Sequence, residues 1–223
     1  MTDIKQYCLI EAFKKGPAIL FIGQSGCGKG TQTAQLIESY KEFLPGAPYL
    51  HSESGQLFRD RIPKFSEWNK ERIGAIQTSG AFQSWVTATC LWATNFLMLY
   101  QGGPVFIDGS PRSPEEVTAL IDFYCDYACK ELIIFVLEID DTKAEHRLVM
   151  RNKQLIKHNL PPRSDTLTPE SRKKKLSFFH SQVVPALDFL EGFHRATVYR
   201  IDGLLPKEEI SRQVLSRLSM YHS

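Results

Sequence analysis

A glycine-rich segment is the stretch of this sequence whose residue types and spacing most directly suggest chemistry. In GQSGCGKGT, Gly23, Gly26 and Gly28 precede Lys29, with an apolar run before the segment and a run of helical spacing after it. Glycines permit sharp turns, so such a loop directs successive backbone N–H groups into one concavity. The start of the helix adds partial positive charge and the lysine adds a full charge. The segment therefore predicts a phosphate-binding loop.

The loop also follows a nucleotide-binding spacing. Gly23, Gly28 and Lys29 fit the P-loop pattern, although Gly30 stands where a serine or threonine usually follows the lysine. The dinucleotide fingerprint G-x-G-x-x-G cannot be threaded through these glycines and leaves Lys29 unexplained. A plain strand-to-helix turn with a solvated lysine is the structural alternative, which the flanking run, the helix and the spacing together disfavour. Cys27 is interpreted as a small filler, because a phosphate loop needs no thiol.

An acid at the end of another apolar run is the second candidate. Triphosphate chemistry requires a magnesium ion, which prefers carboxylate oxygens and often binds through water. In PVFIDG, Asp108 ends the apolar run and is placed to face the loop. An aspartate in this position is commonly a turn residue, but with the loop upstream we favour a role in holding magnesium.

The elements that position these residues follow from short apolar runs. Longer segments of helical spacing separate them, and the five runs cover residues 18–23, 48–53, 104–109, 131–140 and 196–202. Nearly continuous apolar strands that alternate with helices predict an α/β fold with a central parallel five-stranded sheet covered by helices on both faces. Ligands of such sheets bind beyond the carboxyl ends of the strands.

Length and composition narrow the function further. A chain of 223 residues suits one α/β domain over 1–223. Lysine and arginine exceed aspartate and glutamate by only 27 to 25, so we expect no nucleic-acid or membrane-surface partner. Five cysteines without a CxxC motif, and an N-terminus without signal-peptide order, predict a cytoplasmic protein. The uncharged stretch 84–101 is nearly long enough to span a bilayer, but its polar residues favour a core helix.

The chain resembles the adenylate kinase family of nucleoside monophosphate kinases. The family's G-x-x-G-x-G-K-G-T-Q stands at 23–32 and includes the glycine between lysine and threonine. Its D-G-F-P-R appears as DGSPR at 108–112, its S-T-G-D-L-L-R as ESGQLFR at 53–59, and its late D-G at 202–203. The resemblance implies a P-loop NTPase fold with an acceptor-binding segment at about 53–85 and a short lid at about 151–168.

The resemblance also implies the activity and the residues that perform it: reversible transfer of the terminal phosphoryl group of ATP·Mg²⁺ to a nucleoside monophosphate, with AMP as the default acceptor, by a monomer. ATP would be bound by Gly23, Ser25, Gly26, Cys27, Gly28, Lys29, Gly30, Thr31, Arg147 and Gly203. The monophosphate would be bound by Ser54, Gly55, Arg59, Gly109, Arg112 and Glu116. The implied catalytic residues are Lys29, Arg112, Arg151, Arg163, Asp165 and Asp108, the last holding Mg²⁺ through water.

The physics of the reaction agrees with this set. Phosphoryl transfer needs two anions aligned and several cations around the moving group, and the planar fork of arginine suits phosphate oxygens. Arg147 and Arg151, four residues apart on an expected helix, repel by about 0.2–0.5 kcal/mol unless an anion lies between them. The alternative is a solvated basic face paired with Glu145 or Asp141.

The arginines on the acceptor side have their own alternatives. Arg59 taken alone is an ordinary surface ion pair with Asp60. Arg112 is better fixed, because Pro111 forces Ser110 into an extended conformation and so determines where the arginine leaves the strand end.

Some positions depart from the family. Glu116 stands where adenylate kinases carry a glutamine that reads the acceptor adenine, and a carboxylate accepts hydrogen bonds but cannot donate them. Adenine, guanine and cytosine therefore remain open as acceptor bases, with uracil less favoured. Ser54 replaces a threonine, Thr166 replaces the second acid of the lid, and Lys174 or Lys175 takes the place of the last lid arginine.

Two other functions remain open. One is a kinase for CMP, GMP or UMP, and the other is a nucleotide-binding sensor with weak turnover. A P-loop kinase for a small metabolite is disfavoured by DGSPR together with ESGQLFR.

Overall fold

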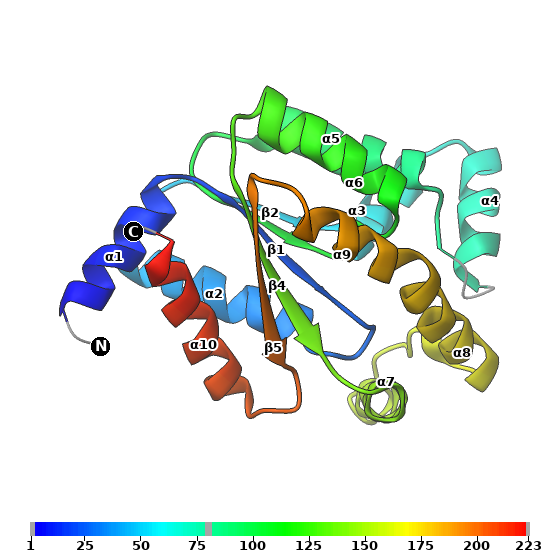
Figure 1. Ribbon diagram of the computed structural model, residues 1–223. Coiled ribbons are helices and arrows are strands. Elements are labelled where there is room, and N and C mark those ends of the chain that lie inside the picture. Colours follow the sequence, from blue (N-terminus) through cyan, green and yellow to red (C-terminus); the bar gives the residue numbers. More distant parts are fainter. Residues whose placement is uncertain (1–2, 79–81, 222–223) are drawn as a thin grey trace.

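A parallel sheet forms the centre of the molecule (Figure 1). The computed structural model describes residues 3–78 and 82–221. All neighbouring strands are parallel and lie in the order β2-β3-β1-β4-β5. The strands are β1 (Ala18–Gly23), β2 (Leu50–Glu53), β3 (Val105–Asp108), β4 (Leu132–Glu138) and β5 (Ala196–Asp202). The predicted α/β fold with a five-stranded parallel sheet is therefore confirmed.

Helices connect the strands and cover both faces of the sheet (Figure 1). The α-helices are α1 (Asp3–Lys14), α2 (Lys29–Phe43), α3 (Ser54–Arg61), α4 (Glu67–Thr78), α5 (Trp85–Leu99), α6 (Pro114–Leu120), α7 (Asp141–Lys157), α8 (Pro169–Phe178), α9 (Val184–Glu191) and α10 (Lys207–Met220). Shorter 3-10 helices are η1 (Ile62–Lys64) and η3 (Ser164–Thr166), and π-helices are η2 (Ile121–Tyr127) and η4 (Phe179–Val183).

Alternation along the strands divides the core into two layers. Leu20 and Ile22 of β1 pack in a cluster with α5, α6 and α9. Ile19 and Phe21 point to the opposite face and pack in a cluster with α1, α2 and α10. Because both faces are apolar and covered, the sheet is a rigid support for the loops at its carboxyl edge.

The two segments predicted to cover the site are excursions from this sheet. In the predicted acceptor segment 53–85, a small cluster of Phe58, Ile73 and Ala88 joins α3, α4 and α5, and residues 79–81 lie outside the described part of the chain. In the predicted lid 151–168, the chain leaves α7 and passes through η3 before α8 begins.

The uncharged stretch 84–101 forms α5, as expected. Trp92 and Phe96 pack into the core, while Leu97 and Met98 are exposed. Within the described part of the chain, no helix is both long and apolar enough to cross a membrane. The following helical segment differs from a regular α-helix, because α6 widens into the π-helix η2. This wide turn accompanies the stack of Tyr124 on Trp92, with ring centroids 5.4 Å apart.

Candidate active site

A cavity of about 920 Å³ lies beyond the carboxyl ends of β1 and β3. Its walls come from the β1–α2 loop, α3, the β3–α6 turn, α7, the predicted lid and α8. It is lined by these predicted residues: Gly23, Ser25, Gly26, Gly28, Lys29, Gly30, Thr31, Gly55, Arg59, Asp108, Gly109, Arg112, Arg147, Arg151, Arg163 and Asp165. Four predicted residues do not line it: Cys27, Ser54, Glu116 and Gly203.

The glycine-rich loop curls around the ammonium group of Lys29. Its Nζ donates to the carbonyl oxygens of Gly23 (2.8 Å) and Gln24 (3.0 Å). Gly26 has a φ of +95°, and a Cβ there would lie 2.9 Å from the carbonyl oxygen of Ala144, so the loop needs a glycine to pass α7. Lys29 is the first residue of α2, so a phosphate bound at this helix N-terminus could accept hydrogen bonds from its ammonium group in place of the loop carbonyls.

Cys27 and Gly203 support the loop from behind. The Cys27 side chain is buried in the core cluster of α1, α2 and α10, as expected of a filler. The Gly203 N–H donates to Glu138 O (2.8 Å), and a Cβ at Gly203 would lie 3.4 Å from Cys27 O. Both residues therefore lie next to the loop but outside the cavity wall.

Asp108 ends β3 opposite the loop and is 8% exposed. Burial raises the pKa of its carboxyl group, while the Lys29 ammonium opposes that rise. A Cβ at Gly30 would lie 3.3 Å from Asp108 Oδ2, so a glycine at this position lets the carboxylate approach the first turn of α2. Hard carboxylate oxygens beside a phosphate-binding loop are a donor set that suits Mg²⁺.

The β3–α6 turn directs Arg112 into the cavity. Its Nε donates to the carbonyl oxygen of Gly109, and its backbone N–H donates to Glu116 Oε2 (2.8 Å). Burial lowers the pKa of the Arg112 guanidinium, against the attraction of nearby carboxylates. The turn therefore fixes the Arg112 backbone and Nε, and its guanidinium group is largely removed from water.

Among the described residues, neither arginine of α7 forms an ion pair with Glu145 or Asp141, and both line the cavity. Arg147 Nη1 donates to the carbonyl oxygen of Cys27 (3.3 Å), and Arg151 Nη2 donates to Thr166 Oγ1 (3.2 Å). Glu145 pairs with Arg172 instead, at 3.1 Å. Arg151 Nε is buried and makes no hydrogen bond among the described residues. Such a donor could pair with an anion only after a shift of the side chain exposes it.

Repulsion between cations adds to this picture. Burial, followed by the charges of Arg163 and Arg59, lowers the pKa of Arg151 to about 10, with Asp165 acting in the opposite direction. A bound phosphate would relieve both the desolvation and the repulsion.

The lid contributes an ion pair at the base of the cavity. Lys175 Nζ lies 3.0 Å from Asp165 Oδ2, and Lys175 is 8% exposed. Burial opposes ionisation of Asp165, but the neighbouring cations hold the pKa of its carboxyl group below the usual value. Lys175 lines the cavity, whereas Lys174 is exposed. Of these two lysines, Lys175 is the one that faces the cavity.

On the acceptor side, Arg59 pairs with Glu53 rather than with Asp60. Its Nη2 lies 3.0 Å from Glu53 Oε1 and 2.7 Å from Gln56 Oε1. Ser54 is buried and shares a hydrogen bond of 2.6 Å with Ser110. Ser54 thus ties the start of α3 to the β3–α6 turn instead of facing the cavity.

Glu116 lies elsewhere than expected for a residue that reads the acceptor base. It is 1% exposed, and its carboxylate accepts from Trp92 Nε1–H (3.2 Å) and from the Arg112 N–H (2.8 Å). A buried carboxylate needs hydrogen-bond donors, and here α5 and the β3–α6 turn provide them, so the carboxylate is not free to bind an acceptor base. The group braces the Arg112 turn from behind the cavity.

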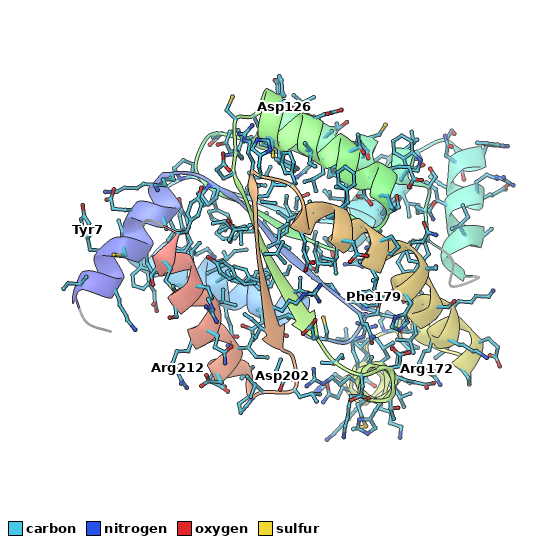
Figure 2. All side chains as sticks on the ribbon, viewed as in Figure 1. Tyr7, Asp126, Arg172, Phe179, Asp202 and Arg212 are labelled. Carbon is cyan, nitrogen blue, oxygen red and sulfur yellow. The ribbon has the colours of Figure 1, made fainter. Side chains whose placement is uncertain are left out.

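Aromatic residues of the cavity were missed in the sequence. Phe82, Phe178 and Phe179 all line it, and Gln83 stands beside Phe82. An aromatic residue before a helix cap or at a helix end carries no distinctive spacing, so the sequence offered no signal. In Figure 2 the labels of Phe179 and Arg172 mark this side of the molecule.

A parallel sheet whose first strand leads through a glycine-rich loop into a helix, with an acid at the end of the neighbouring strand, defines a P-loop NTPase type of α/β protein. The chain is 25% identical over 204 residues to an adenylate kinase of Deinococcus radiodurans. The aligned residues cover 91% of this chain and 96% of the relative. It is also 25% identical to an adenylate kinase of Methylorubrum extorquens, over 90% of this chain and 94% of the relative. A Synechococcus adenylate kinase is 24% identical over 90% of this chain and 98% of the relative. No protein-family model matches the chain.

These relatives support assignment of the chain to the adenylate kinase family. At the level of the family they support a nucleotide-binding phosphotransferase.

Proposed function

We propose that the protein catalyses reversible transfer of the terminal phosphoryl group of ATP·Mg²⁺ to a nucleoside monophosphate, with AMP as the acceptor. The observation that supports this proposal is the convergence of cations from separate elements on one cavity. They are Lys29, Arg59, Arg112, Arg147, Arg151, Arg163 and Lys175. A protein that only binds ATP has no need of cations on both sides of the transferred group, whereas phosphoryl transfer does.

The donor is assigned to the loop side of the cavity. Lys29 and the loop amides hold the donor phosphates, and Arg147, which contacts the loop at Cys27, covers the donor base. Asp108 would hold Mg²⁺ through water, and the ion neutralises phosphate charge when bound. Lys29 gives up its loop carbonyls for phosphate oxygens as the donor enters.

The acceptor is assigned to the opposite side. Arg59 and Arg112 hold the acceptor phosphate and align its oxygen with the terminal phosphorus of the donor. Arg151, Arg163 and Lys175 lie between the two sides and stabilise charge on the moving group. Arg151 lines the cavity, and its Nε makes no hydrogen bond among the described residues, so its charge is assigned to that group.

The two excursions complete the proposal. We assign residues 53–85 to the acceptor and residues 151–168 to a lid that excludes water, within one domain acting as a monomer. All five cysteines are free thiols, which agrees with the cytoplasmic location predicted from the sequence.

A substrate panel tests the proposal. Purified protein is incubated with ATP·Mg²⁺ and AMP, GMP, CMP or UMP, and ADP formation is followed. Fastest turnover with AMP is expected. Faster turnover with another monophosphate would move the assignment to that acceptor, and turnover with none would favour a nucleotide-binding sensor.

Lys29→Met tests the role of the loop in the same assay. The rate is expected to fall by at least about a hundredfold, on the scale of losing one preorganised transition-state cation. Lys41→Met is the control, since Lys41 lies on the same helix and pairs with Glu38 at the surface. A near-normal rate for Lys29→Met would remove the lysine from its assigned role.

A further inference from the structure

Two phenylalanines from distant parts of the chain stack at the edge of the cavity. Phe82 comes from the segment before α5, and Phe178 is the last residue of α8. Their ring centroids are 3.8 Å apart and the ring planes differ by 18°, so the rings lie face to face. The stack joins the predicted acceptor segment to the helix that follows the predicted lid.

Two of the cavity's cations contact the same stack. The Arg112 guanidinium carbon lies 5.1 Å from the Phe82 ring centroid, and Lys175 Nζ lies 4.4 Å from it. Both distances fall within the range in which an aromatic face attracts a cation, and the attraction grows when the cation is desolvated. Lys175 also has Asp165 as a partner, so the ring adds a second restraint on its ammonium group.

The backbone on both sides of the stack is anchored. Ser84 caps α5 by accepting from the Thr87 N–H, and Gln83 Nε2 donates to Ile73 O of α4 at 3.1 Å. These bonds fix the residues that follow Phe82. On α8, Lys175 and Phe178 are three residues apart and share one helix face. The ring and the ammonium therefore approach Phe82 from the same rigid element.

We propose that Phe82 and Phe178 form an aromatic latch that holds the acceptor segment against α8 and positions Arg112 and Lys175 for the transferred group. The latch rests on the proposed function for the identity of its ligands. It preorganises the two cations before substrate arrives, which lowers the cost of ordering them on binding. It also closes the acceptor side of the cavity to water, so that the donor phosphoryl group passes to the acceptor instead of being hydrolysed.

Binding of a dinucleoside pentaphosphate, which spans donor and acceptor positions, tests the latch by calorimetry. Phe82→Ala and Phe178→Ala are each expected to weaken binding about threefold to tenfold, the range of an aromatic pair. The double variant is expected to bind no more weakly than the weaker single variant, because either change alone removes the stack. Phe82→Tyr keeps the ring and should bind like the wild type, whereas Phe82→Leu should not. Phe189→Ala, at an exposed ring on α9, is the control.

Kinetics supply a second readout. With ATP·Mg²⁺ and the monophosphate, Phe82→Ala should raise KM for the monophosphate and the ratio of ATP hydrolysis to transfer, with Tm near the wild-type value. Independent losses that multiply in the double variant, or a Phe82→Ala protein that behaves like Phe189→Ala, would overturn the latch. A wild-type protein that binds the analogue but transfers nothing would overturn the proposed function and leave the latch intact. Absence of binding by the wild type would overturn both.

Discussion

Glu116 offers a prediction on which the sequence and the structure differ. The family resemblance places it against the acceptor base, whereas the structure places it behind the cavity. There its two oxygens accept from the Trp92 indole N–H and the Arg112 backbone N–H. Glu116→Gln, which restores the residue type expected at that position, should therefore disturb the Arg112 turn instead of changing base preference.

The size of the effect follows from those two hydrogen bonds. In Glu116→Gln one acceptor oxygen becomes an NH₂ group, so one of the two N–H donors loses its partner. An unpaired buried donor costs about 1–3 kcal/mol. The change also removes a carboxyl group whose pKa burial raises, which offsets part of that cost. A net loss of about 1–2 kcal/mol in a chain of 223 residues lowers Tm by about 2–8 °C.

Thermal unfolding and the four-monophosphate assay check this prediction together. We expect a lower Tm, a higher KM for every monophosphate because Arg112 is displaced, and an unchanged order of preference among the bases. Glu115→Gln is the control, because Glu115 is the adjacent, exposed residue of the same helix. A changed order of preference with an unchanged Tm would show that Glu116 reads the base and would refute the reasoning.

Other predictions concern charge in and around the cavity. Asp108→Asn removes a carboxyl group whose folded pKa is raised above the unfolded value of 3.8. The wild type loses stability as pH rises from the unfolded pKa towards the folded pKa of Asp108, so melts should show the variant gaining stability relative to wild type as pH rises above 3.8. Arg151→Met should lower kcat about a hundredfold in steady-state assays, whereas Arg172→Met, at a guanidinium paired with Glu145, should leave it near the wild-type value. Burial lowers the pKa of Lys130 from 10.5 to about 8, so melts of wild type against Lys130→Met should show wild type gaining stability from pH 8 to 10.5.

Much of the fold could be predicted because the buried strands of the sheet appear in the sequence as short apolar runs. β1 spans residues 18–23, as predicted, since a strand covered on both faces must be apolar along its length. β5 also spans its predicted residues 196–202, although this edge strand is only partly buried. The widening of α6 into η2 could not be predicted. A π-turn depends on how Tyr124 packs against Trp92 on another helix, and neither sequence segment carries that information.

Site residues could be predicted where the backbone conformation fixes their position, and less well where side-chain packing determines what each residue contacts. Lys29 and Asp108 were found because glycine spacing and strand ends fix them relative to the sheet. The sequence could not reveal that the Glu116 carboxylate accepts a hydrogen bond from a tryptophan on α5. Phe82 was missed for a similar reason, since its significance depends on a ring that lies 96 residues further along the chain.

Repulsion between like charges gives a physical reason why the lysines and arginines of the cavity come from so many separate elements. Cations gathered on one element would repel one another at three- or four-residue spacing unless anions lay between them. The cavity cations come from the loop, α3, the turn, α7, the lid and α8, and two of them keep an anionic partner among the described residues, Glu53 for Arg59 and Asp165 for Lys175. These partners stabilise the protein before substrate binds. Arg151 lines the cavity and has no ion pair among the described residues, so a bound phosphoryl group would supply the anion that this guanidinium lacks.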